Sequence, residues 1–132
     1  MKSFKSFHRD RPILGVIEII DIHDIGQMEA KIDSGDEAYN VLHGIDVDES
    51  DDNVTFTTVG DRRITLQKVG NIDINIGSGN IEHRPTVELS FTIKDQPYCD
   101  IFSIADRAGN EQQVLIGEPF IRKINALIDV KK

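Results

Sequence analysis

The sequence has few of the residues that cross-link or anchor small domains. Its 132 residues include one cysteine, Cys99, and no tryptophan, and only 6% of them are aromatic. A single cysteine cannot form an internal disulfide, and no spacing of Cys and His is typical of a structural zinc site. We therefore expect a protein of a reducing compartment, the cytoplasm, that folds without cross-links.

Positive charge and long apolar runs are also scarce. There are 15 Lys and Arg residues against 23 Asp and Glu, which gives a formal net charge of −8. Binding to a phosphate backbone or to an anionic membrane requires clustered Lys and Arg, so we expect neither nucleic acid nor membrane as a partner. No apolar run approaches the roughly 20 residues that span a bilayer. No apolar signal-peptide stretch follows the basic residues of 1–11.

The sequence is instead rich in β-branched aliphatic side chains, with 20 Ile and 9 Val. These stiff side chains suit pleated strands better than helices. The length suits one domain with a single core. We predict a mostly β domain over residues 13–132, a small closed barrel with one short C-terminal helix, preceded by a flexible N-terminal arm over residues 1–12.

Alternating apolar residues and turn residues place the elements along the chain. The clearest alternation puts Met28, Ala30 and Ile32 on one face of a strand. A charged loop is expected over 46–53, and a helical turn over 119–123 with Pro119 near its start. The predicted strands, in chain order, are residues 13–22, 28–33, 41–45 (a strand or a turn), 54–59, 63–69, 72–76, 84–93, 98–104, 113–116 and 127–130.

The first candidate for chemistry is Asp33-Ser34-Gly35, directly after an alternating strand. This position puts a carboxylate at a strand end. The small residues behind it let the backbone fold back and donate N–H groups to the acid. An ordinary turn remains the alternative, because Asp, Ser and Gly are common turn residues.

Two further segments are candidates. Val114-Leu115-Ile116-Gly117 is a buried strand that ends in glycine, and the alternative is a plain core strand. Ile76-Gly77-Ser78-Gly79-Asn80-Ile81 suits a mobile hairpin tip that closes over a ligand, and the alternative is a simple turn.

The acidic segment 46–52 resembles the start of a calcium loop, but Asp51 stands where Gly is required and Thr57 where Glu is required. A solvated acidic loop explains it better. No P-loop or dinucleotide fingerprint is present, and the four histidines lie in no nucleophile-elbow context.

Taken in order, the three candidate segments resemble a retropepsin-type aspartic protease: acid-Ser/Thr-Gly after a strand, a glycine-containing flap, then two apolar residues and Gly before a short helix. Within this class the chain is similar to the family called ATP-dependent zinc proteases, which is associated with ATP-grasp peptide ligases. The likeness runs from Ile13 to Val130. The segments that carry it are Leu14-Gly15-Val16-Ile17-Glu18, Ala30-Lys31-Ile32-Asp33-Ser34-Gly35-Asp36, Leu42-His43-Gly44, Val54-Thr55-Phe56-Thr57, Glu82-His83-Arg84-Pro85-Thr86, Asp106-Arg107, Val114-Leu115-Ile116-Gly117-Glu118 and Ile128-Asp129-Val130.

The resemblance implies a barrel of the acid-protease type and a homodimer that hydrolyses a peptide or protein substrate. Aspartic proteolysis needs two carboxyl groups that share a proton, and one chain offers a single Asp-Ser-Gly. Asp33 of each protomer would be catalytic. The supporting residues would be Ser34, Gly35, Asp36, Leu115, Ile116 and Gly117, and the substrate flap would be Ile76, Gly77, Ser78, Gly79, Asn80 and Ile81.

The chain departs from the family pattern at Ser34, Asp36 and Glu118, which replace Thr, Ala and Arg, and the segment before Leu42 is one residue longer. These departures keep two alternatives open: a catalytically degenerate peptide-binding module with the same fold, or a structural or assembly barrel in which Asp33 is a turn acid. The family name mentions zinc and ATP. The sequence has no His-Glu-x-x-His, ligand cluster or phosphate loop, so we expect no cofactor and no metal.

Overall fold

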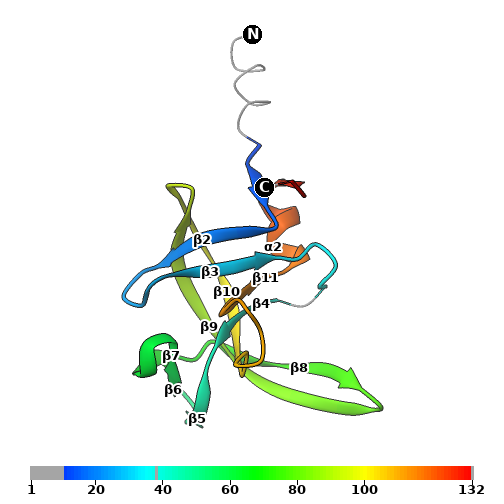
Figure 1. Ribbon diagram of the computed structural model, residues 1–132. Helices are drawn as coiled ribbons and strands as arrows, with labels where there is room; N and C mark the ends of the chain where they lie inside the picture. The colour runs from blue at the N-terminus through cyan, green and yellow to red at the C-terminus, as the bar shows by residue number, and fades with distance from the viewer. Residues whose placement is uncertain (1–10, 38, 132) are drawn as a thin grey trace.

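The computed structural model of the protein describes residues 11–37 and 39–131 (Figure 1), and most of these residues lie in strands. The expected fold class, mostly β with a short helix near the C-terminus, is confirmed. The expected arm over 1–12 lies outside the described residues up to residue 10. Arg11 and Pro12 contact the C-terminal segment: the Leu127 N–H donates to the Pro12 carbonyl at 2.9 Å and Arg11 Nε to the Asn125 carbonyl at 3.0 Å.

The elements follow one another with short turns. The strands are β1 (Ile13–Gly15), β2 (Ile17–Ile22), β3 (Gly26–Ile32), β4 (Asn40–His43), β5 (Ile45–Glu49), β6 (Asn53–Thr58), β7 (Arg62–Gln67), β8 (Gly70–Gly77), β9 (Asn80–Ile93), β10 (Gln96–Ala105), β11 (Val114–Ile116) and β12 (Leu127–Asp129). A 3₁₀ turn, η1 (Val59–Asp61), joins β6 to β7, and the helix α2 (Glu118–Lys123) follows β11.

Seven strands form the main sheet, in the order β10-β4-β11-β3-β2-β9-β8. Strand β10 also pairs with β9, so the hydrogen-bonded order returns on itself. Strands β5, β6 and β7 form a separate antiparallel sheet, and β1 and β12 form a parallel pair. In Figure 1 the β5–β7 sheet lies at the lower left and the β8–β9 hairpin projects to the lower right.

The core lies among the strands of the main sheet and α2, and Leu14 of β1 and Val54 and Phe56 of β6 also contribute to it. Met28, Ala30 and Ile32 on β3 are buried and their neighbours are exposed, as the alternation predicts. Burial of a large aliphatic side chain contributes roughly 1.5–3 kcal/mol to stability. Helix α2 adds Phe120 to the core, and the centroid of its ring lies 5.5 Å from that of Phe91 on β9. The core therefore holds α2 close to the end of β11.

Gly44 allows β4, β6 and β10 to approach closely. A Cβ added at this position would lie 2.4 Å from Ile104 Cγ2 and 2.7 Å from Phe56 Cδ2, closer than real Cβ contacts. A side chain at residue 44 would therefore force these strands apart.

Two expectations about strands are wrong. The single strand expected over 13–22 is split at Val16, because β1 pairs with β12 whereas β2 pairs with β3 and β9. The Gly15 N–H donates to Glu18 Oε2 at 2.7 Å, which stabilises the bend. The charged loop expected at 46–53 contains most of strand β5, since the Asp48 and Glu49 backbones pair with β6 while their side chains stay exposed. Because most side chains of β5 are charged and exposed, its sequence lacks the alternation of buried apolar residues from which a strand is predicted.

Candidate active site around Asp33

Asp33 lies where two parallel strands end side by side. Strand β3 pairs with β11 in the register Ile32 to Ile116. The Asp33 N–H then continues the pairing and donates to the Ile116 carbonyl at 2.9 Å. Leu115 and Ile116 are buried, at 7% and 0% exposure. The backbone of Asp33 is therefore fixed to a strand that belongs to the core.

The Asp33 carboxylate is held by its own turn. The Gly35 N–H donates to Asp33 Oδ1 at 3.0 Å, and a Cβ at residue 35 would lie 3.3 Å from the same oxygen. The side chain of Asp33 is 31% exposed, and its second oxygen, Oδ2, lies 3.8 Å from Lys31 Nζ. One carboxylate oxygen is thus oriented by backbone, while the other faces a lysine.

The loop behind Asp33 is anchored to α2. The Asp36 N–H donates to the Asp33 carbonyl at 3.2 Å, and the Asp36 carbonyl accepts the Glu118 N–H at 2.8 Å. Ser34 is exposed, as is Gly35. The structure therefore brings Asp33, Gly35, Asp36 and the 115–117 segment together in one place.

Asn40 is a site residue that the sequence analysis missed. It is 1% exposed, and its Oδ1 accepts the Gly117 N–H at 3.1 Å. Its Nδ2 donates to Asp100 Oδ2 at 2.9 Å and to the Ile101 carbonyl at 3.1 Å. The amide thus joins β4, β10 and the residue before α2. An Asn at the head of an apolar strand was the available signal, because buried amides require partners.

Arg107 lies close to Asp33 and Asp36. The sequence analysis named Arg107 only as part of the family resemblance. It is 9% exposed, its Nε donates to the Gln112 carbonyl at 3.1 Å, and its backbone N–H donates to His43 Nδ1 at 2.9 Å. Burial lowers the pKa of the guanidinium, Asp36 and Asp33 oppose this, and Arg84 adds to it. Because arginine keeps its proton in proteins, a buried positive charge stands near the Asp33 loop.

The expected flap is a hairpin tip. Gly77, Ser78 and Gly79 have positive φ angles of 102°, 53° and 77°, which the tight turn between β8 and β9 requires. Ile76 and Ile81 flank the turn and are 57% and 59% exposed. Figure 1 shows the β8–β9 hairpin projecting to the lower right, and the register pairs Gly77 with Asn80 at its tip. That residues 76–81 cover the Asp33 site stays a prediction.

The middle of strand β8 borders a cavity together with the Asp33 loop. This cavity of about 540 Å³, here called the β8 cavity, lies between that loop, the start of α2 and β8. Its lining residues are Glu37, Tyr39, Ile72, Asp73, Ile74 and Pro119. An extended ligand in this cavity would lie beside the loop that carries Asp33.

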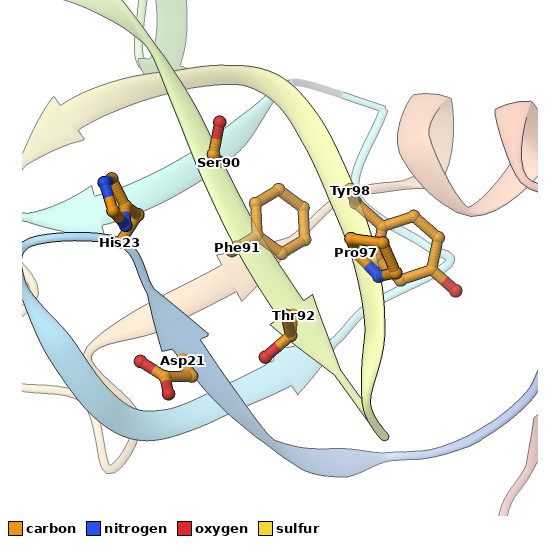
Figure 2. Close-up of a pocket in the computed structure, with 7 residues that line it drawn as sticks. All are labelled: Asp21, His23, Ser90, Phe91, Thr92, Pro97 and Tyr98. Atoms are coloured by element: carbon orange, nitrogen blue, oxygen red, sulfur yellow. The ribbon is translucent and has the colours of Figure 1, made fainter.

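A second cavity, of about 470 Å³, lies elsewhere (Figure 2). Asp21 and His23 border one side, Pro97 and Tyr98 the other, and residues 90–92 of β9 lie between them. The His23 side chain is 76% exposed and lies 3.5 Å from Asp24, while its backbone N–H binds the Ser90 carbonyl. His23 is therefore not oriented toward Ser90 as a general base would be.

Within residues 11–37 and 39–131, no group of three or more His, Cys, Asp or Glu side chains is arranged to hold a metal ion. The described residues thus do not fit the zinc of the family name. In the same part of the chain, no helix is long and apolar enough to cross a membrane.

Comparison with known proteins gives a match in fold alone. No protein-family model and no curated protein matches the chain. Among solved structures, the chain is similar to protein Lpg0085 of unknown function (DUF785) from Legionella pneumophila subsp. pneumophila str. Philadelphia 1. The TM-score is 0.76 at 23% identity, and the match covers 92% of this chain and 95% of that one. At this identity the likeness defines the fold that the two proteins share and leaves the activity open.

Proposed function

We propose that the protein is a homodimeric aspartic endopeptidase of the retropepsin-like class, similar to the family called ATP-dependent zinc proteases. The observation that carries the proposal is the setting of Asp33. Its backbone is bound to Ile116 of the parallel strand, its carboxylate is oriented by the Gly35 N–H, and its side chain stays 31% exposed. A catalytic acid needs this combination of fixed geometry and access.

We also propose that the main sheet closes into a barrel of the acid-protease type, because its first strand, β10, also pairs with β9. Strand β9 pairs with β2 at one end and with β10 along most of its length, and this supports closure. In such a barrel the Asp33 loop would lie at one rim, where a second protomer has access to it.

In the proposed reaction, the ionised Asp33 of one protomer takes a proton from a bound water. The resulting hydroxide attacks the peptide carbonyl carbon while the protonated Asp33 of the partner gives its proton to the carbonyl oxygen. The tetrahedral intermediate then collapses: the C–N bond breaks, a proton passes to the leaving nitrogen, and an acid and an amine remain. Two carboxyl groups that share one proton are the condition for each step.

The parallel pair β1–β12 is our candidate for part of the dimer interface. Ile13 and Leu127 are paired in register and are 47% and 44% exposed, and Val130 beyond them is 76% exposed. A two-stranded sheet with exposed apolar side chains favours pairing with a second copy. A two-fold axis beside this sheet would make the interface isologous.

The test is the Asp33→Asn variant of the full chain, because Asn keeps the Oδ1 acceptor for Gly35. We expect the wild type to release new amino termini from unfolded casein, and the variant to lose at least about 100-fold in rate, the smallest contribution usual for an acid-base group. Asp51→Asn, the same change in an exposed turn, is the control. Equal rates for Asp33→Asn and wild type would contradict the proposal.

A binding module without catalysis is the second candidate, and Lys31 favours it. Its ammonium group lies 3.8 Å from the Asp33 oxygen that the water or the shared proton would use. If the protein is a peptidase, Lys31→Met should leave cleavage equal or faster. If it is a module, wild type and variant should both bind peptide without cutting it.

A further inference from the structure

Two walls of the β8 cavity are bound to each other, and the third belongs to a paired strand. The loop that carries Glu37 and Tyr39 is tied to α2 through the Asp36 carbonyl and the Glu118 N–H at 2.8 Å. Pro119, which follows Glu118, forms another part of the wall. The remaining part is β8, which pairs with β9 residue by residue. The cavity is therefore built by the same loop that orients Asp33.

The cavity combines apolar surface with negative charge. Ile72, Ile74 and Pro119 supply apolar surface, and the Tyr39 side chain is 45% exposed. The two charged residues of the lining are both acids, Glu37 and Asp73, and none of the six lining residues is basic.

The charged groups next to the cavity are already matched. Asp73 is paired across the hairpin with His83, whose Nδ1 lies 2.5 Å from Asp73 Oδ1. Arg84 stands opposite Ile72, but its guanidinium is bound to Glu82. No cation of this part of β9 is thus left to neutralise Glu37.

The cavity also borders an open strand edge. Strand β8 is the last strand of the seven-stranded order and pairs with β9. Ile72, Asp73 and Ile74 are consecutive and all line the cavity, so the cavity runs along the strand rather than over one of its faces. An extended peptide can add to such an edge through backbone hydrogen bonds, with its side chains entering adjacent pockets.

We propose that the β8 cavity binds a lysine or arginine side chain of a peptide extended along β8. The long alkyl stem packs on the two isoleucines and Pro119. The charged end lies near Glu37, and beside Asp73, whose carboxylate stays paired with His83. The net charge of −8 favours the approach of basic peptides. This inference rests on the proposed function, since it selects the substrate of the Asp33 site.

The experiment uses two pools of synthetic decapeptides that differ at one fixed central position, Lys in one pool and norleucine in the other. Cleavage by the wild type is followed by mass spectrometry. Binding of the same pools to Asp33→Asn is measured separately. Because an exposed charge pair contributes up to about 1 kcal/mol, or about fivefold, we expect the Lys pool to be favoured by up to about fivefold. The Glu37→Gln/Asp73→Asn variant should lose this preference, and Asp51→Asn should keep it.

The outcomes separate the two proposals. Equal cleavage of both pools leaves the peptidase standing and overturns the cavity assignment. Selective binding of the Lys pool by Asp33→Asn, with no cleavage by the wild type, supports the cavity and contradicts the peptidase. A Lys preference that survives in Glu37→Gln/Asp73→Asn overturns the cavity assignment, and so does binding of neither pool.

Discussion

The Asp33 N–H donates to the Ile116 carbonyl at 2.9 Å, and this bond joins the candidate catalytic turn to the buried strand β11. Ile116 is fully buried, so the position of Asp33 depends on core packing rather than on the turn alone. Substitutions in the exposed turn should therefore change activity more than stability. Substitutions of buried residues near it should change mainly the free energy of unfolding.

Gly35→Ala should impair function more than folding. The new Cβ would lie 3.3 Å from Asp33 Oδ1, so the carboxylate must shift by a few tenths of an ångström. Small misplacements of a reacting group reduce rates strongly, whereas an exposed turn tolerates them. We expect a loss of roughly tenfold or more in kcat/KM on casein, with urea unfolding changed by less than about 1 kcal/mol. An unchanged kcat/KM would contradict the orienting role of this turn.

Asn40→Ala should destabilise the protein. It leaves the buried Gly117 N–H without its acceptor and removes one partner of the partly buried Asp100 carboxylate, which keeps Lys123. An unsatisfied buried polar group costs about 1–3 kcal/mol, so the free energy of unfolding should fall by about that amount. Urea denaturation measures it, and Asn110→Ala, at an exposed position, is the matched control. A loss no larger than that of the control would show that the amide has no such role.

Gly44→Ala and Gly109→Ala form a matched pair. At residue 44 a Cβ meets Ile104 and Phe56 at 2.4 and 2.7 Å, while at residue 109 nothing lies within 4 Å. Overpacking costs about 1–3 kcal/mol, whereas Ala at a compatible position is neutral or slightly stabilising. Thermal unfolding of both variants should show a lower Tm for Gly44→Ala alone. Equal Tm values would contradict the close approach of β4, β6 and β10.

Tyr98 should make stability fall at high pH. Burial raises the pKa of its phenol above the ordinary value of 10.0. A group whose pKa is higher in the folded state contributes stability that is complete below its unfolded pKa and is lost as the pH rises through the folded pKa. The free energy of unfolding should therefore decrease above about pH 10. Urea titrations of wild type and Tyr98→Phe should show a smaller decrease in the variant, and parallel curves would refute the effect.

Local patterns predicted the strands whose side chains alternate in burial. Strand β3, the β6–β7 hairpin, the short buried β11 and the helix after Pro119 were predicted because each leaves a signal within a few residues. Asp33 was found in the same way, from an acid at a strand end. These features depend on neighbours in the chain, which a sequence displays directly.

The missed features depend on partners that are distant in the sequence. Val16 divides a segment rich in Ile and Val because β12 lies beside one half and β9 beside the other. Asn40 and Arg107 are polar residues that are usually exposed, and only the folded structure shows that both are buried. How far the β8–β9 hairpin projects from the sheets (Figure 1) is likewise specified by no local pattern.

The most direct test of the central claim is a crystal structure of the assembly that the full chain forms in solution, with the separation of the two Asp33 carboxyl groups measured in it. The proposal predicts a two-fold dimer in which these groups lie roughly 3 Å apart, close enough to share one proton. A monomer, or an assembly in which the two Asp33 side chains are remote from each other, would contradict it.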